Sequence, residues 1–256
     1  MEVTMVDIKQ EFLDRGTSAI SNSLDKLVSN ERMSREEADS AFSRIVSSVD
    51  LESLSDCDLV VEAIPEIPEL KFSTFSRLDS ICKPKAILAS NTSSISINEI
   101  ASHTNRADRV IGMHFMNPVP IMKLVEIING SETSEEVTSE VVHASEQMGK
   151  IPLSCIDSPG FVSNRILMPM INEAILTLQE GVAEPEASDG IMKLGMNHPI
   201  GPLALADLIG LDTVLHIMNV LQEGMGSDKY SPAEMLVEMV EDGKLGRKSG
   251  SGFYQY

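Results

Sequence analysis

Residues 111–126 read IGMHFMNPVPIMKLVE, in which two apolar runs are joined by a turn that contains two prolines. The first run ends near His114, and the pair Asn117-Pro118 favours an extended turn. The second run continues past Glu126 to Asn129-Gly130, a pair that is typical of turns. Both runs have the length and composition of short buried strands. If they lie side by side, the carboxylate of Glu126 can reach the imidazole of His114.

A histidine paired with a carboxylate is a common general base. The carboxylate holds one ring nitrogen, which sets the tautomer and stabilises the imidazolium. The other ring nitrogen can then take a proton from a hydroxyl group, so the pair suits the oxidation of a secondary alcohol. The residue types alone also fit a buried His114 with no catalytic role, for which Glu126 is only the hydrogen-bond partner of the ring.

Strand-like and helix-like segments alternate before Asp157, whereas the pattern after Asp157 is wholly helical. Strands are expected at residues 2–6, 58–64, 86–90, 109–113, 123–128 and 151–155. Helices are expected at residues 11–29, 34–46, 68–81, 97–101, 134–148, 186–196, 202–208, 212–223 and 232–242, with a long helix after Ser158 that contains Pro169. Near-continuous apolar strands are typical of a parallel sheet that is covered on both faces.

Composition excludes several classes of function. The 256 residues are 42% hydrophobic and 23% charged, which is ordinary for a globular protein. Lys and Arg number 20 against 39 Asp and Glu, so a net charge of -19 argues against nucleic-acid or anionic-membrane partners. Cys57, Cys82 and Cys155 lack disulfide or metal-ligand spacing, and no apolar run is long enough to span a bilayer. We therefore expect a cytoplasmic protein without a bound metal.

Three further segments accompany the 111–126 stretch: ASNTSS at residues 89–94, DSPGFVSNR at 157–165 and GRKSGSGFY at 246–254. Together, in this order and spacing, they resemble the short-chain L-3-hydroxyacyl-CoA dehydrogenase family, and the 3-hydroxybutyryl-CoA dehydrogenases within it most closely. The resemblance runs along the whole chain. It implies an α/β fold, with a Rossmann-like NAD-binding domain built on a parallel sheet over residues 1–156 and an all-α substrate-binding and dimerisation domain over 157–256.

The resemblance also implies a reaction. An L-3-hydroxyacyl-CoA, such as 3-hydroxybutyryl-CoA, is reversibly oxidised by NAD to the 3-ketoacyl-CoA, in fatty acid β-oxidation or butanoate metabolism. His114 would take the hydroxyl proton, Glu126 would orient His114, and Ser93 and Asn164 would hydrogen-bond the substrate. Ser93 could instead cap a helix, and Asn164 could be an ordinary polar residue in a first helical turn.

Further positions match family residues that bind the cofactor or the coenzyme A part of the substrate. Asp7, at the end of the first strand, matches the carboxylate that binds the adenosine ribose, and it implies NAD because a carboxylate repels the 2′-phosphate of NADP. Asp7 could also simply begin a turn. The other matches are Glu66, Lys71, Ser93, Asn117 and Lys248 for the cofactor and Ser23 for coenzyme A. Without the resemblance, both lysines would pass as solvated side chains.

One part of the family pattern has no counterpart in these residues. Family members open with a strand and a Gly-x-Gly-x-x-Gly turn whose backbone N–H groups bind the pyrophosphate, whereas MEVTMVD at residues 1–7 matches the second strand. We therefore expect a shortened form of a protein that begins about 20 to 30 residues earlier, and a poor enzyme.

Two alternatives stay open on the sequence. A non-catalytic family member could act as a binding or structural protein, although it would have no reason to keep His114, Glu126, Ser93 and Asn164 together. A different Rossmann-type dehydrogenase could act on a small hydroxy acid, although the NPVP and PGFVSNR segments weigh against it.

Overall fold

The computed structural model describes all 256 residues, which divide into two compact units. Unit 1 comprises Met1–Thr92 and Ile97–Ile156, and unit 2 comprises Ser93–Ser96 and Asp157–Tyr256. The boundary between the long segments thus falls between Ile156 and Asp157. The short segment Ser93–Ser96 clusters with the helical unit, although the sequence pattern places it in the first domain.

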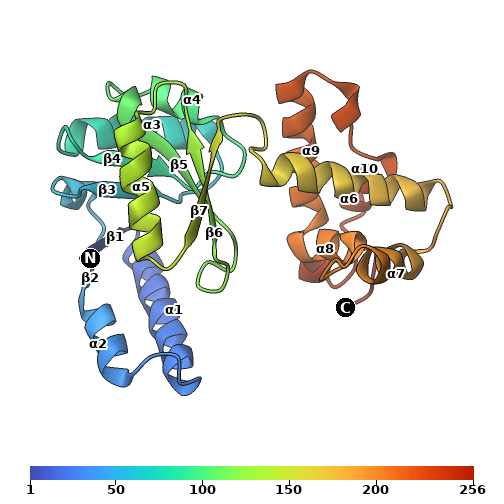
Figure 1. Cartoon of the computed structure of the whole chain (residues 1–256), viewed down its shortest axis with the longest axis horizontal. Helices are drawn as coiled ribbons and strands as arrows, with labels where there is room; N and C mark the ends of the chain where they lie inside the picture. The colour runs from blue at the N-terminus through green and yellow to red at the C-terminus, as the bar shows by residue number, and fades with distance from the viewer. The chain divides into compact units, whose positions relative to one another are not determined.

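Unit 1 alternates strands and helices along the chain (Figure 1). Its strands are β1 (Val3–Val6), β2 (Ile45–Ser48), β3 (Leu59–Glu62), β4 (Ile87–Ser90), β5 (Val110–Phe115), β6 (Leu124–Asn129) and β7 (Ile151–Ile156). Its helices are α1 (Gln10–Ser29), α2 (Arg35–Ser43), α3 (Pro68–Ile81), α4 (Ile97–Ser102) and α5 (Glu135–Gln147).

The strands form two sheets rather than one. Strands β1 and β2 pair in parallel, and a five-stranded sheet has the order β3-β4-β5-β6-β7. All neighbours in the larger sheet are parallel except β5 and β6, which are antiparallel. The connection over residues 116–123 is too short for the helical crossover that parallel strands need, so this pair has to be antiparallel.

The core of unit 1 lies around the middle strands of the larger sheet. Strand β4 is buried along its whole length, β5 is buried except at Phe115, and β6 is buried except at its two end residues. Helix α5 crosses one face of this sheet over β6 and β7 (Figure 1). Val125 and Ile127 of β6 pack there against Val137 and Val141 of α5. Strand β7 is an exposed edge, so the expectation of a sheet covered on both faces holds only for the middle strands.

Strand β2 differs from the prediction of a helix over residues 34–46. Helix α2 begins as expected, with a capping box between Ser34 and Glu37, but it ends at Ser43. Ile45 and the following residues then pair with β1, with Val3 opposite Ile45. The β-branched Ile45 and Val46 favour a strand once a partner is present, but four residues give too short a pattern to predict one.

Unit 2 is built from α6 (Ser163–Gln179), α7 (Pro185–Gly195), α8 (Pro202–Ile209), α9 (Leu211–Met225) and α10 (Glu234–Glu241). Apolar side chains of α6, α8, α9 and α10 form one buried core. No single helix is long and apolar enough to cross a membrane. Helices α8 and α9 together are long and apolar enough to span a bilayer, but the chain bends by 98° between them. Their apolar side chains form much of the buried core of unit 2.

A buried aspartate ties the C-terminal segment to unit 2. Asp207, only 1% exposed, accepts hydrogen bonds from the backbone N–H groups of Phe253 and Tyr254 and from the hydroxyl of Tyr256. A Cβ atom at Gly252 would lie 1.9 Å from Oδ1 of Asp207, so only glycine allows this close approach. Burial and the carboxylate of Asp189 raise the pKa of Tyr254, so its hydroxyl stays a donor to Asp189.

Candidate active site

The predicted contact between His114 and Glu126 is present in unit 1. The antiparallel register places the two residues directly opposite each other on β5 and β6. Nδ1 of His114 lies 2.9 Å from Oε2 of Glu126, and the two side chains are 9% and 6% exposed. Little water reaches this hydrogen bond, so the interaction is stronger than it would be in solvent. The pair has the geometry of a histidine base oriented by a carboxylate.

Two neighbouring residues fix the position of this pair. Gly112 lies two residues before His114, and a Cβ atom there would lie 2.8 Å from Cβ of Ile128 on β6. The glycine therefore lets β6 and α4 pack closely beside the histidine. Asn91 follows β4, and its Oδ1 accepts a hydrogen bond of 2.8 Å from the backbone N–H of Phe115. This bond anchors the end of β5 immediately after His114.

Ser93 and Asn164 are brought together in unit 2. Nδ2 of Asn164 donates a 3.0 Å hydrogen bond to the backbone carbonyl of Ser93, across 71 positions of sequence. Asn164 lies in the first turn of α6 and is 7% exposed. Ser93 lies in a bend before α4, which starts only at Ile97, so it does not cap that helix as the alternative interpretation supposed.

Glu66 and Lys71 belong to a buried polar cluster at the carboxyl ends of β3 and β4. The ammonium of Lys71 lies 2.7 Å from Oε1 of Glu62 and 3.3 Å from Oε2 of Glu66. Lys71 is 1% exposed, so it is not the solvated lysine that the sequence alone would suggest. Glu66 also accepts a hydrogen bond of 2.5 Å from the hydroxyl of Thr92. Its side chain is 30% exposed and is the part of the cluster most open to solvent.

The remaining predicted residues lie apart from these clusters. Asp7 is exposed directly after β1, and its Oδ1 accepts a 2.7 Å hydrogen bond from the N–H of Ile8. Ser23 is half-buried on α1, and Asn117 precedes a cis peptide bond to Pro118.

Lys248 lies in a short 3₁₀ helix of unit 2, where its ammonium forms an ion pair with Asp212. Burial alone would raise the pKa of Asp212, but the hydrogen bond from Lys248 and that from the N–H of Thr213 hold it below the ordinary value.

Glu62 and Asn91 make contacts that the sequence did not lead us to expect. Asn91 directly follows the strand predicted over residues 86–90, whereas Glu62 lies inside the strand predicted over residues 58–64, where the sequence offers no signal for it. No group of three or more His, Cys, Asp or Glu side chains is arranged to hold a metal ion.

Comparisons with known proteins agree on one family. The family model described as "3-hydroxyacyl-CoA dehydrogenase, NAD binding domain" matches residues 1–158, and that of the C-terminal domain matches residues 160–256. A probable 3-hydroxybutyryl-CoA dehydrogenase of Deinococcus radiodurans is 57% identical over 100% of this chain and 91% of the relative. One of Bacillus subtilis is 53% identical over 99% of this chain and 88% of the relative.

A solved structure gives the same result. The crystal structure of (S)-3-hydroxybutyryl-CoA dehydrogenase from Ralstonia eutropha superposes with a TM-score of 0.98 at 50% sequence identity. The match covers 100% of this chain and 90% of that one.

Proposed function

The chain belongs to the 3-hydroxyacyl-CoA dehydrogenase family, and from this premise we propose that it oxidises an L-3-hydroxyacyl-CoA of the 3-hydroxybutyryl type to the 3-ketoacyl-CoA with NAD. The observation that carries the proposal is the buried 2.9 Å hydrogen bond between His114 and Glu126. The reverse reaction uses the same residues, since a base in one direction is the acid in the other.

His114 acts as the base that removes the proton of the substrate hydroxyl. Glu126 holds Nδ1, so Nε2 is the ring atom that receives this proton. As the imidazolium forms, its positive charge lies beside the carboxylate of Glu126 in a site with little water, which stabilises the product of proton transfer. The C3–O–H group thereby loses its proton to His114 while C3 becomes a carbonyl carbon.

Ser93 and Asn164 bind the substrate as hydrogen-bonding groups. The 3.0 Å hydrogen bond from Asn164 to the carbonyl of Ser93 holds the two residues together, so their polar groups keep a fixed position relative to each other. Ser23 on α1 contacts the coenzyme A part of the substrate. These roles rest on the match to the family pattern, and the hydrogen bond supports a shared role for Ser93 and Asn164.

The donor and acceptor groups of unit 1 suit NAD at two of its parts. The exposed carboxylate of Asp7 can accept hydrogen bonds from the adenosine ribose, and it disfavours the 2′-phosphate of NADP. Glu66, the most open member of the cluster at the carboxyl ends of β3 and β4, would contact the nicotinamide ribose, while the buried Lys71 would hold Glu66 in place. Asn117 in unit 1 and Lys248 in unit 2 each match a family position that contacts the cofactor. When bound, NAD accepts the hydride from C3.

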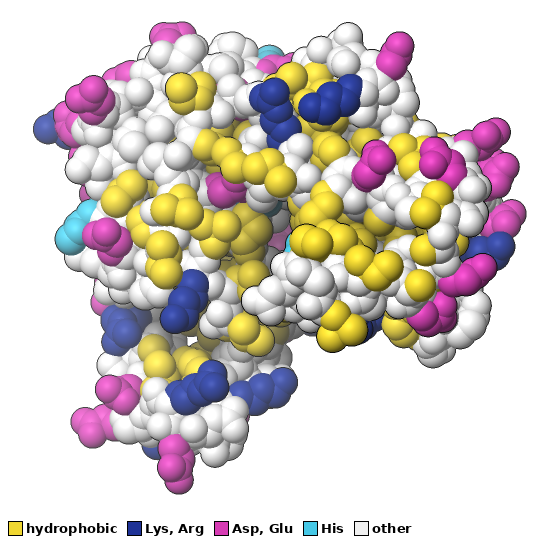
Figure 2. All heavy atoms as spheres, turned by 45° about the vertical axis from the view of Figure 1, so that its right-hand side comes forward, with side chains coloured by type: hydrophobic (Ala, Val, Ile, Leu, Met, Phe, Trp, Pro, Cys, Tyr) yellow, Lys and Arg dark blue, Asp and Glu magenta, His cyan; other side chains and the backbone are white.

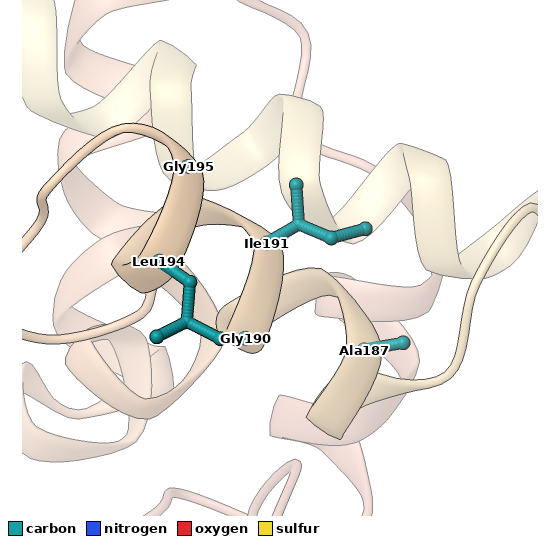
Figure 3. A pocket seen from close by; sticks show the side chains of 5 residues that line it. All are labelled: Ala187, Gly190, Ile191, Leu194 and Gly195. Carbon is teal, nitrogen blue, oxygen red and sulfur yellow. The ribbon is translucent and has the colours of Figure 1, made fainter.

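We also propose that the protein forms a homodimer through unit 2. Figure 2 shows apolar side chains gathered on the helical unit and acidic side chains along its margin. Helix α7 exposes Ile191 and Leu194, which are 61% and 91% exposed and line a shallow hollow with Ala187, Gly190 and Gly195 (Figure 3). A Cβ atom at either glycine would meet no atom within 4 Å, so packing inside the chain does not require glycine there.

The glycine inside α7 supports the dimer because glycine in a helix costs about 1 kcal/mol relative to alanine. A second chain that approaches the α7 backbone closely would explain a glycine at position 190. For the location, Cys57, Cys82 and Cys155 form no disulfide, which supports a reducing compartment, and we propose that this is the cytoplasm.

The test of the function is turnover of (S)-3-hydroxybutyryl-CoA, followed by the absorbance of NADH. We expect slow turnover from the wild-type chain, because its residues contain no Gly-x-Gly-x-x-Gly turn, and we expect His114→Gln to lower kcat at least about 100-fold further, the range for losing a general base. The matched control is His143→Gln, because His143 is exposed on α5. Near-normal kcat in His114→Gln would remove His114 from the mechanism. Tight NADH binding without turnover in the wild type would favour a binding protein instead.

A further inference from the structure

Glu62 is a buried acid to which the proposed mechanism gives no role. It is the last residue of β3 and is 5% exposed. Its Oε1 accepts hydrogen bonds from the N–H of Ile64 at 2.6 Å and from the ammonium of Lys71 at 2.7 Å. Its Oε2 accepts one from the hydroxyl of Ser90 at 2.7 Å. One carboxylate therefore joins the ends of β3 and β4 to the first turn of α3.

Lys71 links this acid to the more open part of the cluster. Its ammonium has three N–H donors and three acceptors around it: Glu62 at 2.7 Å, the carbonyl of Ile64 at 3.2 Å and Glu66 at 3.3 Å. Each donor therefore has a partner within the cluster. Removing Glu62 would leave the ammonium free to turn toward Glu66, so the carboxylate of Glu66, which Thr92 also holds, would meet Lys71 in a changed geometry.

The position of the cluster indicates a ligand rather than stability alone. Ligands of parallel α/β sheets bind beyond the carboxyl ends of the strands, which is where Glu62 and Ser90 end β3 and β4. A buried ion pair contributes little net stability compared with apolar side chains of the same size, because both ions lose their hydration. Two carboxylates around one ammonium therefore stabilise the fold less than apolar side chains of the same size would.

We propose that Glu62 is a positioning residue for the cofactor: it fixes the ammonium of Lys71 and, through it, the carboxylate of Glu66, so that the outer part of the cluster meets the nicotinamide ribose in one geometry. The inference rests on the proposed function, because it presupposes that Glu66 and Lys71 lie at the NAD site. Glu62 itself touches neither cofactor nor substrate. Its effect therefore falls on binding of the cofactor and not on the chemical step.

The experiment compares Glu62→Gln with Glu69→Gln in the full chain. Glu69 lies exposed in the first turn of the same helix, so its replacement makes the same change of charge without touching the cluster. KM for NADH and kcat are measured in the reduction of acetoacetyl-CoA, and Kd for NADH is measured by fluorescence titration. We expect Glu62→Gln to raise KM and Kd for NADH at least about tenfold, with kcat and KM for acetoacetyl-CoA changed less than about threefold. Glu69→Gln should match the wild type.

A second variant separates positioning from a loss of folding. Glu62→Gln alone leaves Lys71 short of a carboxylate partner in a buried place, which destabilises the chain. The variant Ser90→Ala removes the hydrogen bond to Oε2 of Glu62 and so destabilises the same place, but it keeps the carboxylate beside Lys71. If Ser90→Ala and Glu62→Gln both lose NADH affinity in step with the fall in their unfolding temperature, Glu62 is only structural and the inference is wrong. If Ser90→Ala is destabilised but binds NADH like the wild type while Glu62→Gln does not, the positioning role is supported.

The outcomes also distinguish this inference from the proposed function. An active wild type whose KM for NADH does not change in Glu62→Gln contradicts the inference alone. A wild-type chain that neither binds NADH nor reduces acetoacetyl-CoA contradicts the proposed function and the inference with it.

Discussion

Replacing Glu126 by glutamine tests the proposed mechanism at the contact that carries it. The amide has nearly the shape of the carboxylate, so the packing between β5 and β6 should change little. What is lost is a charge 2.9 Å from Nδ1 of His114, between side chains that are 9% and 6% exposed. A hydrogen bond to a charged group contributes about 1.5 to 3 kcal/mol. The charge acts mainly when His114 becomes an imidazolium, so this energy is lost mostly from the transition state.

The expected loss follows from this range. Each 1.36 kcal/mol of transition-state stabilisation is a factor of ten in rate, so kcat for Glu126→Gln should fall by roughly 10-fold to 150-fold. KM for the acyl-CoA should change less than about threefold, because the hydrogen bond changes little on substrate binding. The assay is NADH formation from (S)-3-hydroxybutyryl-CoA. Glu146→Gln is the control, because Glu146 lies exposed on α5.

The double variant shows whether the two residues act as one unit. If Glu126 acts only through His114, then His114→Gln combined with Glu126→Gln should be no slower than His114→Gln alone. A double variant slower by the product of the two single effects would show that Glu126 has a role of its own. A Glu126→Gln variant with wild-type kcat and an unchanged unfolding temperature would refute the argument that the carboxylate stabilises the imidazolium.

Three further predictions concern the cofactor, acid stability and self-association. The wild type should favour NAD over NADP at least about tenfold in kcat/KM, and Asp7→Ser should lower this preference. Equal kcat/KM with both cofactors in the wild type would show that Asp7 does not bind the ribose. Burial alone would raise the pKa of Asp79, but hydrogen bonds from Asn105 and Arg106 hold it below the ordinary value of 3.8. Asp79→Asn should therefore lower the free energy of unfolding by about 2 to 4 kcal/mol at neutral pH. In denaturant titrations this difference should persist above pH 3.8 and vanish as the pH falls below it through the lowered pKa; a difference that does not depend on pH would contradict the assignment. Leu194→Lys should shift the protein from dimer to monomer in sedimentation, and an unchanged mass would exclude α7 as the interface.

The sequence by itself determined most of the local structure. Apolar runs, prolines and caps predicted α3 with its bounds, the starts of α2 and α8, and the two strands around His114 and Glu126. The order of these residues shows that Glu126 can reach His114 if the two strands lie side by side, and the structure supplies the antiparallel pairing that places them opposite each other. These features depend on interactions between residues close in the chain, which a single sequence displays directly.

The tertiary structure decided the contacts between distant segments. Strand β2 forms because β1 lies beside it, and its four residues look too much like a helix end to be predicted alone. Ser93 joins unit 2 because Asn164, 71 positions later, binds its carbonyl. Glu62 accepts a hydrogen bond from Ser90, 28 positions away on the next strand.

The same physical reason underlies each of these cases. A hydrogen bond between residues far apart in sequence depends on how whole elements pack, and packing is set by the summed burial of many side chains rather than by any local pattern. An isolated Glu at a strand end looks the same whether it faces solvent or a buried lysine. Only the fold, by placing β3, β4 and α3 around it, makes Glu62 the centre of a cluster.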